Sequence, residues 1–143
     1  MNPTYRPAAN PALALLLMRV GAGLLLLVIH GLPKLWHWQT ELTVIEDPFG
    51  LGAVLTLSFA VFAEVICALL LILGIWARLA CVPILAVLLV SVTLVHPEWS
   101  LAEGQFAWLM IVLFGGLSIS GAGPYRVTLF LRHGHPAATG PHT

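Results

Sequence analysis

The sequence carries very little charge, and this shortage excludes a water-soluble fold. Only 8% of its 143 residues are Asp, Glu, Lys or Arg, whereas 59% are hydrophobic and the mean hydropathy is +0.98. A soluble domain carries about 25% charged residues. So few charges cannot cover a body of this size with polar surface. We therefore predict an integral membrane protein, with the lipid bilayer as its first partner.

Several chemical motifs are also missing. The two cysteines, Cys67 and Cys81, form no CxxC pair, which argues against a thiol–disulfide relay and favours packing as small hydrophobic side chains. No phosphate loop, GxGxxG motif or Ser–His–Asp pattern is present, and the histidines do not follow HxxxH or HExxH spacing. The sequence therefore indicates no metal or nucleotide cofactor, and we expect no nucleic-acid partner.

What the chain does contain is four long apolar stretches. They are roughly residues 12–31, 51–76, 79–96 and 106–122. A membrane-spanning helix needs about 20 such residues, and its backbone groups must be satisfied within the helix. Because the loops are short, consecutive helices pack as antiparallel neighbours. The sequence predicts an all-α fold in one integral membrane domain, an antiparallel four-helix bundle with loose tails at residues 1–11 and 133–143.

Basic residues are distributed unevenly between the two ends of these stretches. Five arginines lie on the side of the termini, whereas the opposite side has Lys34 and five of the six acidic residues. The positive-inside rule then places both termini in the cytoplasm. The first stretch is too long for a signal-peptide core and lacks a small-residue cleavage site, so we expect it to remain as an anchor. These features predict a multi-pass protein of the bacterial inner membrane.

Glu64 is the clearest ionisable group at membrane depth, in the middle of the second stretch. Such a group costs about 2.5–3.5 kcal/mol on insertion scales, so it needs a partner or a function. Arg19 is the natural partner, because it lies roughly 10 Å inside the cytoplasmic boundary and Glu64 roughly 18 Å. We predict an Arg19–Glu64 pair. The alternative is that Arg19 reaches back to the cytoplasmic head groups.

The polar side chains of the first stretch share one helix face. Arg19 and His30 are separated by about 20° around the helix, and Lys34 lies about 40° further. Gly23 lies on the same face, where a small residue permits close helix approach. A polar face in lipid points to the bundle interior. We do not expect the helix to continue through Pro33, because proline breaks or kinks helices.

A polar cluster is expected at the outer mouth of the bundle. His96 ends the third stretch at a depth similar to that of His30, and Glu103 follows in the next loop. These two residues can therefore meet His30 and Lys34 at one site. The alternative is a set of interfacial groups within a belt formed by four nearby tryptophans. That alternative explains His30 less well, because His30 precedes the belt and lies on the interior face.

Taken in order, these positions resemble the DoxX family of small four-helix membrane proteins. The matching segments are MRVGAGLLLLVIHGLPKL at 18–35, AEVICALLLILGIWAR at 63–78, His96, GGLSISGAG at 115–123, and Tyr125. HG-x-x-KL followed by an acid and then LG-x-x-x-R is moderately specific in combination. The resemblance covers roughly residues 17–125, which is most of the chain.

The resemblance implies a link to membrane oxidoreductase systems. These include subunits of thiosulfate:quinone oxidoreductase and complexes with sulfur-handling and superoxide-handling partners. The chain departs from the family after the glycine-rich exit. Members often continue into a tyrosine and an acidic residue, but GPYRVTLFLRH at 123–133 contains no acid. No role for that family carboxylate can therefore be transferred to this sequence.

The first hypothesis is a subunit of an oxidoreductase system that binds a quinone or another lipophilic small molecule. The predicted ligand-binding residues are Arg19, His30, Lys34 and Glu103. The predicted catalytic residues, which would move protons, are Glu64 and His96. No electron carrier is visible, so electrons must pass through the ligand or a protein partner in a redox complex. Whether the chain is catalytic alone, and whether it forms homo-oligomers, stays open.

Two other hypotheses are kept. The first is a non-catalytic membrane scaffold that recruits soluble redox enzymes and whose polar residues only lock the bundle. The second is a small proton-coupled transporter with a buried Glu; such transporters place their essential acid in the first helix, where this chain has Arg19 and His30. Bound quinone, stable protein partners alone, or proton-driven substrate flux would distinguish the three.

Overall fold

The structure is a computed structural model that describes residues 10–127, and within this range all regular structure is helical. Three continuous helical rods are long and apolar enough to cross a membrane: Pro11–Trp36, Ala53–Leu73 and Ala77–Val95. A further apolar helix, α7 (Gln105–Ser120), has 16 residues and is about 24 Å long. The protein is therefore an all-helical membrane protein.

Each long rod contains a π-helical turn, written η, within α-helix. The first rod consists of α1 (Pro11–Leu26), η1 (Leu27–Gly31) and α2 (Leu32–Trp36), and is followed by the short helix α3 (Trp38–Val44). The second consists of α4 (Ala53–Val61), η2 (Phe62–Cys67) and α5 (Ala68–Leu73). The third consists of α6 (Ala77–Val90) and η3 (Ser91–Val95).

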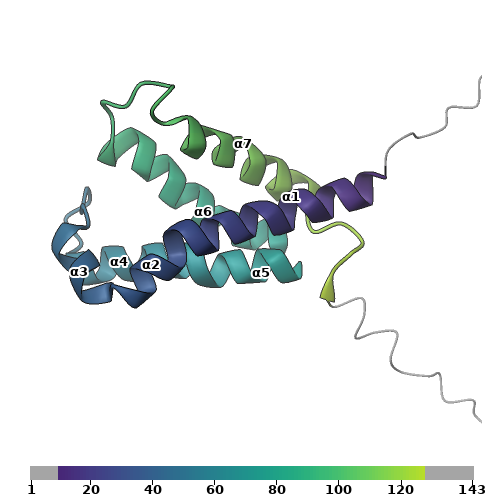
Figure 1. The fold of residues 1–143 in the computed structure, drawn as a ribbon, viewed down its shortest axis with the longest axis horizontal. Helices are drawn as coiled ribbons and strands as arrows, with labels where there is room; N and C mark the ends of the chain where they lie inside the picture. Colours follow the sequence, from purple (N-terminus) through teal and green to yellow (C-terminus); the bar gives the residue numbers. More distant parts are fainter. Residues whose placement is uncertain (1–9, 128–143) are drawn as a thin grey trace, which may run out of the picture.

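Successive rods run in opposite directions, so the molecule has two distinct ends (Figure 1). At the left of the figure lie α2, α3, the start of α4 and the turn that joins the third rod to α7. We call this the histidine end, because it carries His30 and His96. At the right lie the start of α1 and the exit from α7. We call this the arginine end, because it carries Arg78 and Arg126.

The first rod begins at a local N-terminal signal. The side chain of Asn10 accepts a hydrogen bond from the Leu13 backbone N–H at 3.3 Å, and Pro11 occupies the first helical position. Apart from Asn10 and Pro11, the predicted tails 1–11 and 133–143 lie outside the described residues.

The helix continues through Pro33 as far as Trp36, so the expected break at this proline is wrong. The reason is η1, which ends two residues before Pro33. Within this wider turn the Leu32 N–H donates to the Leu27 carbonyl, five residues earlier, instead of four. A π-helical turn shifts the hydrogen-bond pattern by one residue, and such shifts accommodate helix interruptions. The rod therefore extends five residues beyond the end of the predicted span 12–31, and its last turn carries Lys34.

The first two rods pack closely at two glycines. A Cβ on Gly23 would lie 2.6 Å from the Ile72 side chain, and a Cβ on Gly31 would lie 2.6 Å from the Glu64 carbonyl oxygen. Gly23 and Gly31 are eight positions apart on the first rod, and their contacts Ile72 and Glu64 are eight positions apart, in reverse order, on the second. This register, which only small residues permit, fixes the height of Glu64 beside the first rod.

The core lies between the rods and is almost wholly apolar. Phe114 of α7, Leu71 of α5 and Ile84 of α6 are fully buried. Cys67 and Cys81 are free thiols buried in the same cluster, in agreement with their expected role as small hydrophobic side chains. Two charged residues interrupt this core, Arg19 at 2% exposure and Glu64 at 5%. Their partners define the two polar regions of the molecule.

Candidate functional site: a polar cavity at the histidine end

A cavity of about 760 Å³ opens between the rods at the histidine end. Its walls come from the first rod at η1 and α2, from α3 and the following loop, and from the second rod at α4 and η2. The half of the third rod nearer the histidine end and the start of α7 complete them. Most of the lining is apolar. Its polar members include five of the six residues that the sequence predicts for the site: His30, Lys34, Glu64, His96 and Glu103.

Lys34 and Glu64 form an ion pair at this cavity. The ammonium Nζ of Lys34 donates to both carboxylate oxygens of Glu64, at 2.6 and 2.7 Å. The Glu64 side chain is 6% exposed and that of Lys34 is 23% exposed, so the pair is buried on the carboxylate side and open on the amine side. A buried carboxylate needs such a partner, because charge is costly in an apolar surrounding.

Helix geometry explains why these two residues meet. Glu64 lies level with Gly31, three residues before Lys34 on the first rod. Side chains on a helix lean toward its N-terminus, so Lys34 leans back toward the level of Gly31. Glu64 leans in the opposite direction in space, because its rod is antiparallel. The two side chains therefore converge across the close contact at Gly31.

The predicted pairing of Arg19 with Glu64 is wrong. The Arg19 guanidinium donates to the backbone carbonyls of Ala122 and Tyr125, the latter at 2.7 Å. A Cβ on Gly74 would lie 2.7 Å from its Nη1, so Arg19 is level with Gly74, ten residues and about 15 Å along the rod from Glu64. The sequence places them roughly 8 Å apart in depth because it takes the two spans to begin and end at one level, whereas the first rod begins at Pro11, eight residues before Arg19, and Arg19 is level with the end of the second rod.

Arg19 consequently does not line the cavity, although it was predicted to bind the ligand. It is a buried anchor at the arginine end. Its hydrogen bonds hold the chain that leaves α7 against the first rod, over more than a hundred residues of sequence separation.

His30 and Ser91 bring unused hydrogen-bonding groups to the cavity. The His30 ring stacks on Phe106 with centroids 5.6 Å apart, and neither of its nitrogens has a hydrogen-bond partner within residues 10–127. The Ser91 hydroxyl likewise has no partner in the described chain, although it lies within a helical rod. Four other hydroxyls in the rods and α7 bond back to their own backbone: Ser58, Thr93, Ser118 and Ser120. An unpaired donor facing an apolar cavity is available to a ligand.

His96 and Glu103 line the cavity with partners of their own. The His96 ring stacks on Trp99 at 3.9 Å, and its Nδ1 lies 3.6 Å from the Glu98 carboxylate. Glu103 accepts hydrogen bonds from the Ser100 backbone N–H at 2.8 Å and from its hydroxyl at 2.7 Å. These bonds hold the pKa of the Glu103 carboxyl below its usual range. The main work of Glu103 is thus to close the turn before α7.

The three π-helical turns all border this cavity. His30 lies within η1, Glu64 within η2, and Ser91 opens η3. A π-helical turn costs hydrogen-bond geometry and is found frequently at functional sites, where it redirects side chains. Because all three border one cavity, this part of each rod is shaped for the cavity rather than for packing alone. No pattern in the sequence reveals them.

The loop after α3 forms a wall that the sequence analysis did not identify. Asp47 accepts hydrogen bonds from the backbone N–H groups of Gly52 at 2.5 Å and Leu51 at 3.0 Å, and from the Thr56 hydroxyl at 2.9 Å. The Gly52 bond, followed by those of Leu51 and Thr56, holds the pKa of Asp47 below its usual value. Asp47 thereby folds residues 47–52 over the start of α4, which brings Phe49 to the cavity. The one feature of the sequence that points to this turn is an aspartate five residues before a glycine, Asp47 and Gly52.

The donor set suits an uncharged polar head better than a metal ion. Within residues 10–127 no three His, Cys, Asp or Glu side chains gather closely enough to hold a metal. The cavity instead combines the Lys34 ammonium, two imidazoles and two hydroxyls with an aromatic wall. The carboxylates that line it are Glu41, Glu46, Glu64 and Glu103. Such a set can donate hydrogen bonds to carbonyl oxygens and pack against a flat ring.

The DoxX family model matches residues 14–97, which is more than half of the chain and includes Lys34, Glu64 and His96. No curated protein matches the chain. No solved structure matches it either.

Proposed function

This chain belongs to the DoxX family of membrane proteins, which is associated with membrane oxidoreductase systems, and we propose that it binds a quinone or another lipophilic molecule with a carbonyl-bearing head. The ligand occupies the cavity at the histidine end. The observation that carries this proposal is the pair of unused donors, His30 and Ser91, beside the Lys34–Glu64 ion pair in a mostly apolar cavity.

The cavity fits a quinone in size and in chemistry. Ligand pockets are commonly about 300–1,000 Å³, and this one is about 760 Å³. His30 and Ser91 can donate to carbonyl oxygens, and the open side of the Lys34 ammonium can add a charge-assisted bond. Phe106 and Trp99 supply flat apolar surfaces for a ring. A bound quinone would contribute reversible two-electron, two-proton chemistry; the residues described here bind and orient it.

Glu64 is the residue we assign to proton handling. Its carboxylate lines the cavity, accepts two hydrogen bonds from Lys34 and is shielded from solvent. His96 lies on the same cavity with its Nδ1 toward Glu98, on the exposed side. We propose that these two groups exchange protons between the cavity and the aqueous surface, as carboxyl and imidazole groups do in membranes.

The same proposal includes a membrane topology. Helix α7 and the three longer rods form four spans, with both termini in the cytoplasm of a bacterial cell and the cavity in the outer leaflet. Supporting this orientation, Arg19, Arg78 and Arg126 all lie at the arginine end, and five of the six acidic residues lie at or beyond the histidine end. Electrons then reach the ligand through a protein partner on that side.

The test is equilibrium binding of a short-tailed benzoquinone to the full chain in nanodiscs. His30→Ala and Ser91→Ala should each weaken binding about tenfold, since each removes one hydrogen bond to a desolvated carbonyl. The matched controls are His37→Ala, an exposed histidine outside the cavity, and Ser58→Ala, whose hydroxyl bonds to its own backbone. Equal effects of site and control variants would contradict the proposal. Absence of quinone binding together with stable protein partners would favour the scaffold.

A further inference from the structure

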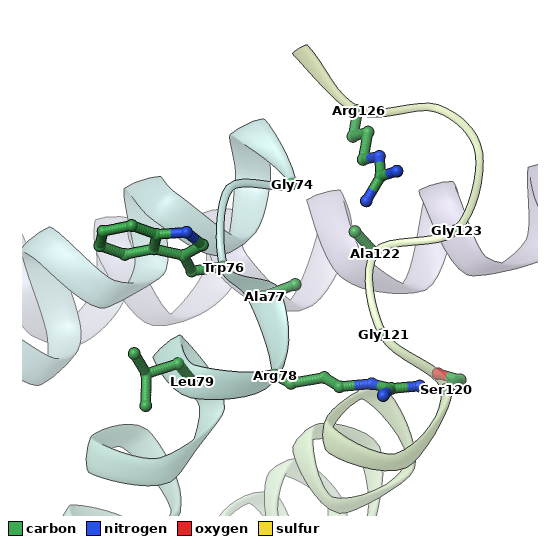
Figure 2. A pocket seen from close by; sticks show the side chains of 10 residues that line it. All are labelled: Gly74, Trp76, Ala77, Arg78, Leu79, Ser120, Gly121, Ala122, Gly123 and Arg126. Carbon is green, nitrogen blue, oxygen red and sulfur yellow. The ribbon is translucent and has the colours of Figure 1, made fainter. Parts of the chain in front are cut away.

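A second cavity, of about 560 Å³, lies at the arginine end and has no role in the function proposed above. It is formed between the turn that joins the second and third rods and the chain that leaves α7 (Figure 2). Arg78 runs from the start of α6 toward Ser120 and Gly121, and Arg126 extends from the opposite side above Ala122. Two guanidinium groups from separate elements therefore face one hollow.

Within residues 10–127 no carboxylate neutralises these two arginines. All six acidic residues of the sequence lie within the described range, and the ion pairs found there join Lys34 to Glu64 and His96 to Glu98. Glu64 is ten residues from Gly74 along its rod, and the other five acids lie toward the histidine end. The positive charge of the hollow is thus available to an anion.

The backbone adds donors to the same hollow. Helix α6 begins at Ala77 without a side-chain cap, and the first N–H groups of a helix have no acceptor within it. Ala77, Arg78 and Leu79 all line the hollow, so these N–H groups and the positive end of the helix dipole supplement the arginines. Trp76, with φ of 46°, holds the left-handed conformation that turns the chain into α6.

The opposite wall is built to let Arg78 approach. Gly121 has φ of 80°, and a Cβ there would lie 3.1 Å from the Arg78 Nε. Glycine at this position therefore allows the guanidinium to lie against the turn. Arg19 holds that turn from behind through the carbonyls of Ala122 and Tyr125, so those two acceptors are already occupied.

The apolar neighbours identify the kind of anion. Beside the hollow, Trp76 is 74% exposed, Leu79 64% and Val82 58%, and they follow the outer face of α6 toward the middle of the rod. An exposed tryptophan at a helix end followed by exposed aliphatic side chains suits the membrane interface and the acyl chains below it. We propose that this hollow binds the phosphate group of an anionic phospholipid, with Arg78 and Arg126 as its charged ligands.

The test measures lipid retention by native mass spectrometry of the full chain in detergent. Phosphatidylglycerol should give a one-to-one adduct, and phosphatidylcholine should bind about tenfold more weakly, since its head group adds a positive charge beside the arginines. Arg78→Gln and Arg126→Gln should each reduce the phosphatidylglycerol adduct about tenfold. Arg132→Gln, which removes the same charge from outside the described residues, is the control and should leave the adduct unchanged.

Each other outcome overturns the proposal. Equal retention of the two lipids would remove the requirement for net negative charge. Competition by inorganic phosphate at the same concentration as the lipid would make the hollow a site for free phosphate rather than for a lipid. Equal losses in Arg132→Gln would reduce the effect to general charge attraction. Melting temperatures without added lipid verify that Arg78→Gln and Arg126→Gln fold, and the exposed Arg126 gives an independent result if Arg78→Gln is unstable.

Discussion

Lys34 and Glu64 are joined by two hydrogen bonds of 2.6 and 2.7 Å, made from the last turn of the first helical rod to the middle of the second. Both residues line the cavity, and the pair forms beside the contact of Gly31 with the Glu64 backbone, where the first two rods pack closely. It also replaces the pairing with Arg19 that depth alone suggested. The stability of the protein and the shape of its cavity therefore depend on the same two residues.

Breaking this pair should destabilise the protein strongly. Glu64→Gln leaves the Lys34 ammonium without its counter-charge, and Lys34→Met leaves a buried carboxylate, so each should lower the free energy of unfolding by about 3–5 kcal/mol. The double variant Lys34→Met/Glu64→Gln should recover a large part of the loss. Thermal unfolding in detergent measures this, with the exposed Glu46→Gln as a control that should have little effect. Additive losses in the double variant would argue against direct coupling.

Gly31 and Gly21 offer a matched test of the close helix contact. Gly31→Ala places a Cβ 2.6 Å from the Glu64 carbonyl oxygen and should cost about 1–3 kcal/mol through forced separation of the rods. Gly21→Ala meets nothing within 4 Å and should be neutral or stabilising by up to about 1 kcal/mol, because alanine favours helix. The comparison uses the same unfolding assay. Equal effects at the two positions would show that Gly31 is not a contact point.

The Asp47 turn should depend on pH. Because hydrogen bonds from Gly52, Leu51 and Thr56 lower the pKa of Asp47 from its ordinary 3.8, the folded state favours the ionised carboxylate. The stabilisation is complete above pH 3.8 and is lost as the pH falls through the lower pKa of the folded state. Hydrogen exchange at Leu51 and Gly52, expressed relative to the intrinsic rate of an unstructured amide at the same pH, should therefore accelerate in that acidic range. Asp47→Asn should accelerate it already at neutral pH, and fast exchange that does not respond to this variant would contradict the assignment.

Topology can be tested by labelling cysteines with a membrane-impermeant reagent on intact cells. Thr40→Cys, exposed in α3, should react, whereas Val127→Cys, exposed after α7, should react only after the cells are opened. Cys67 and Cys81 are buried and give a low background. Labelling of residue 127 but not of residue 40 in intact cells would invert the orientation.

Much of this architecture could be predicted from the sequence, because it depends on composition and helical periodicity. Long apolar runs define the rods, and the shared face of His30 and Lys34 predicts that both point inward. Gly23 was expected to permit close approach, and it lies against Ile72. The DoxX resemblance agrees with the family match to residues 14–97.

The details that sequence reasoning missed depend on register between rods. The partner of Glu64 is decided by the register between the first two rods, which is set at the contact of Gly31 with the Glu64 backbone and has no periodic signal. The π-helical turns, and the continuation through Pro33 that η1 permits, are likewise set by tertiary packing. Phe106, stacked on His30, could not be assigned because aromatic residues near a membrane interface are common.

Site mapping with a photoreactive benzoquinone tests the central claim most directly. The full chain in nanodiscs is labelled with the probe, with and without excess unlabelled quinone, and the modified residues are located by peptide mass spectrometry. The account predicts adducts on residues that line the cavity at the histidine end, such as Phe59, Ser91 and Phe106, and their loss on competition. Adducts that resist competition and spread over lipid-facing positions such as Leu17 and Val112 would contradict it.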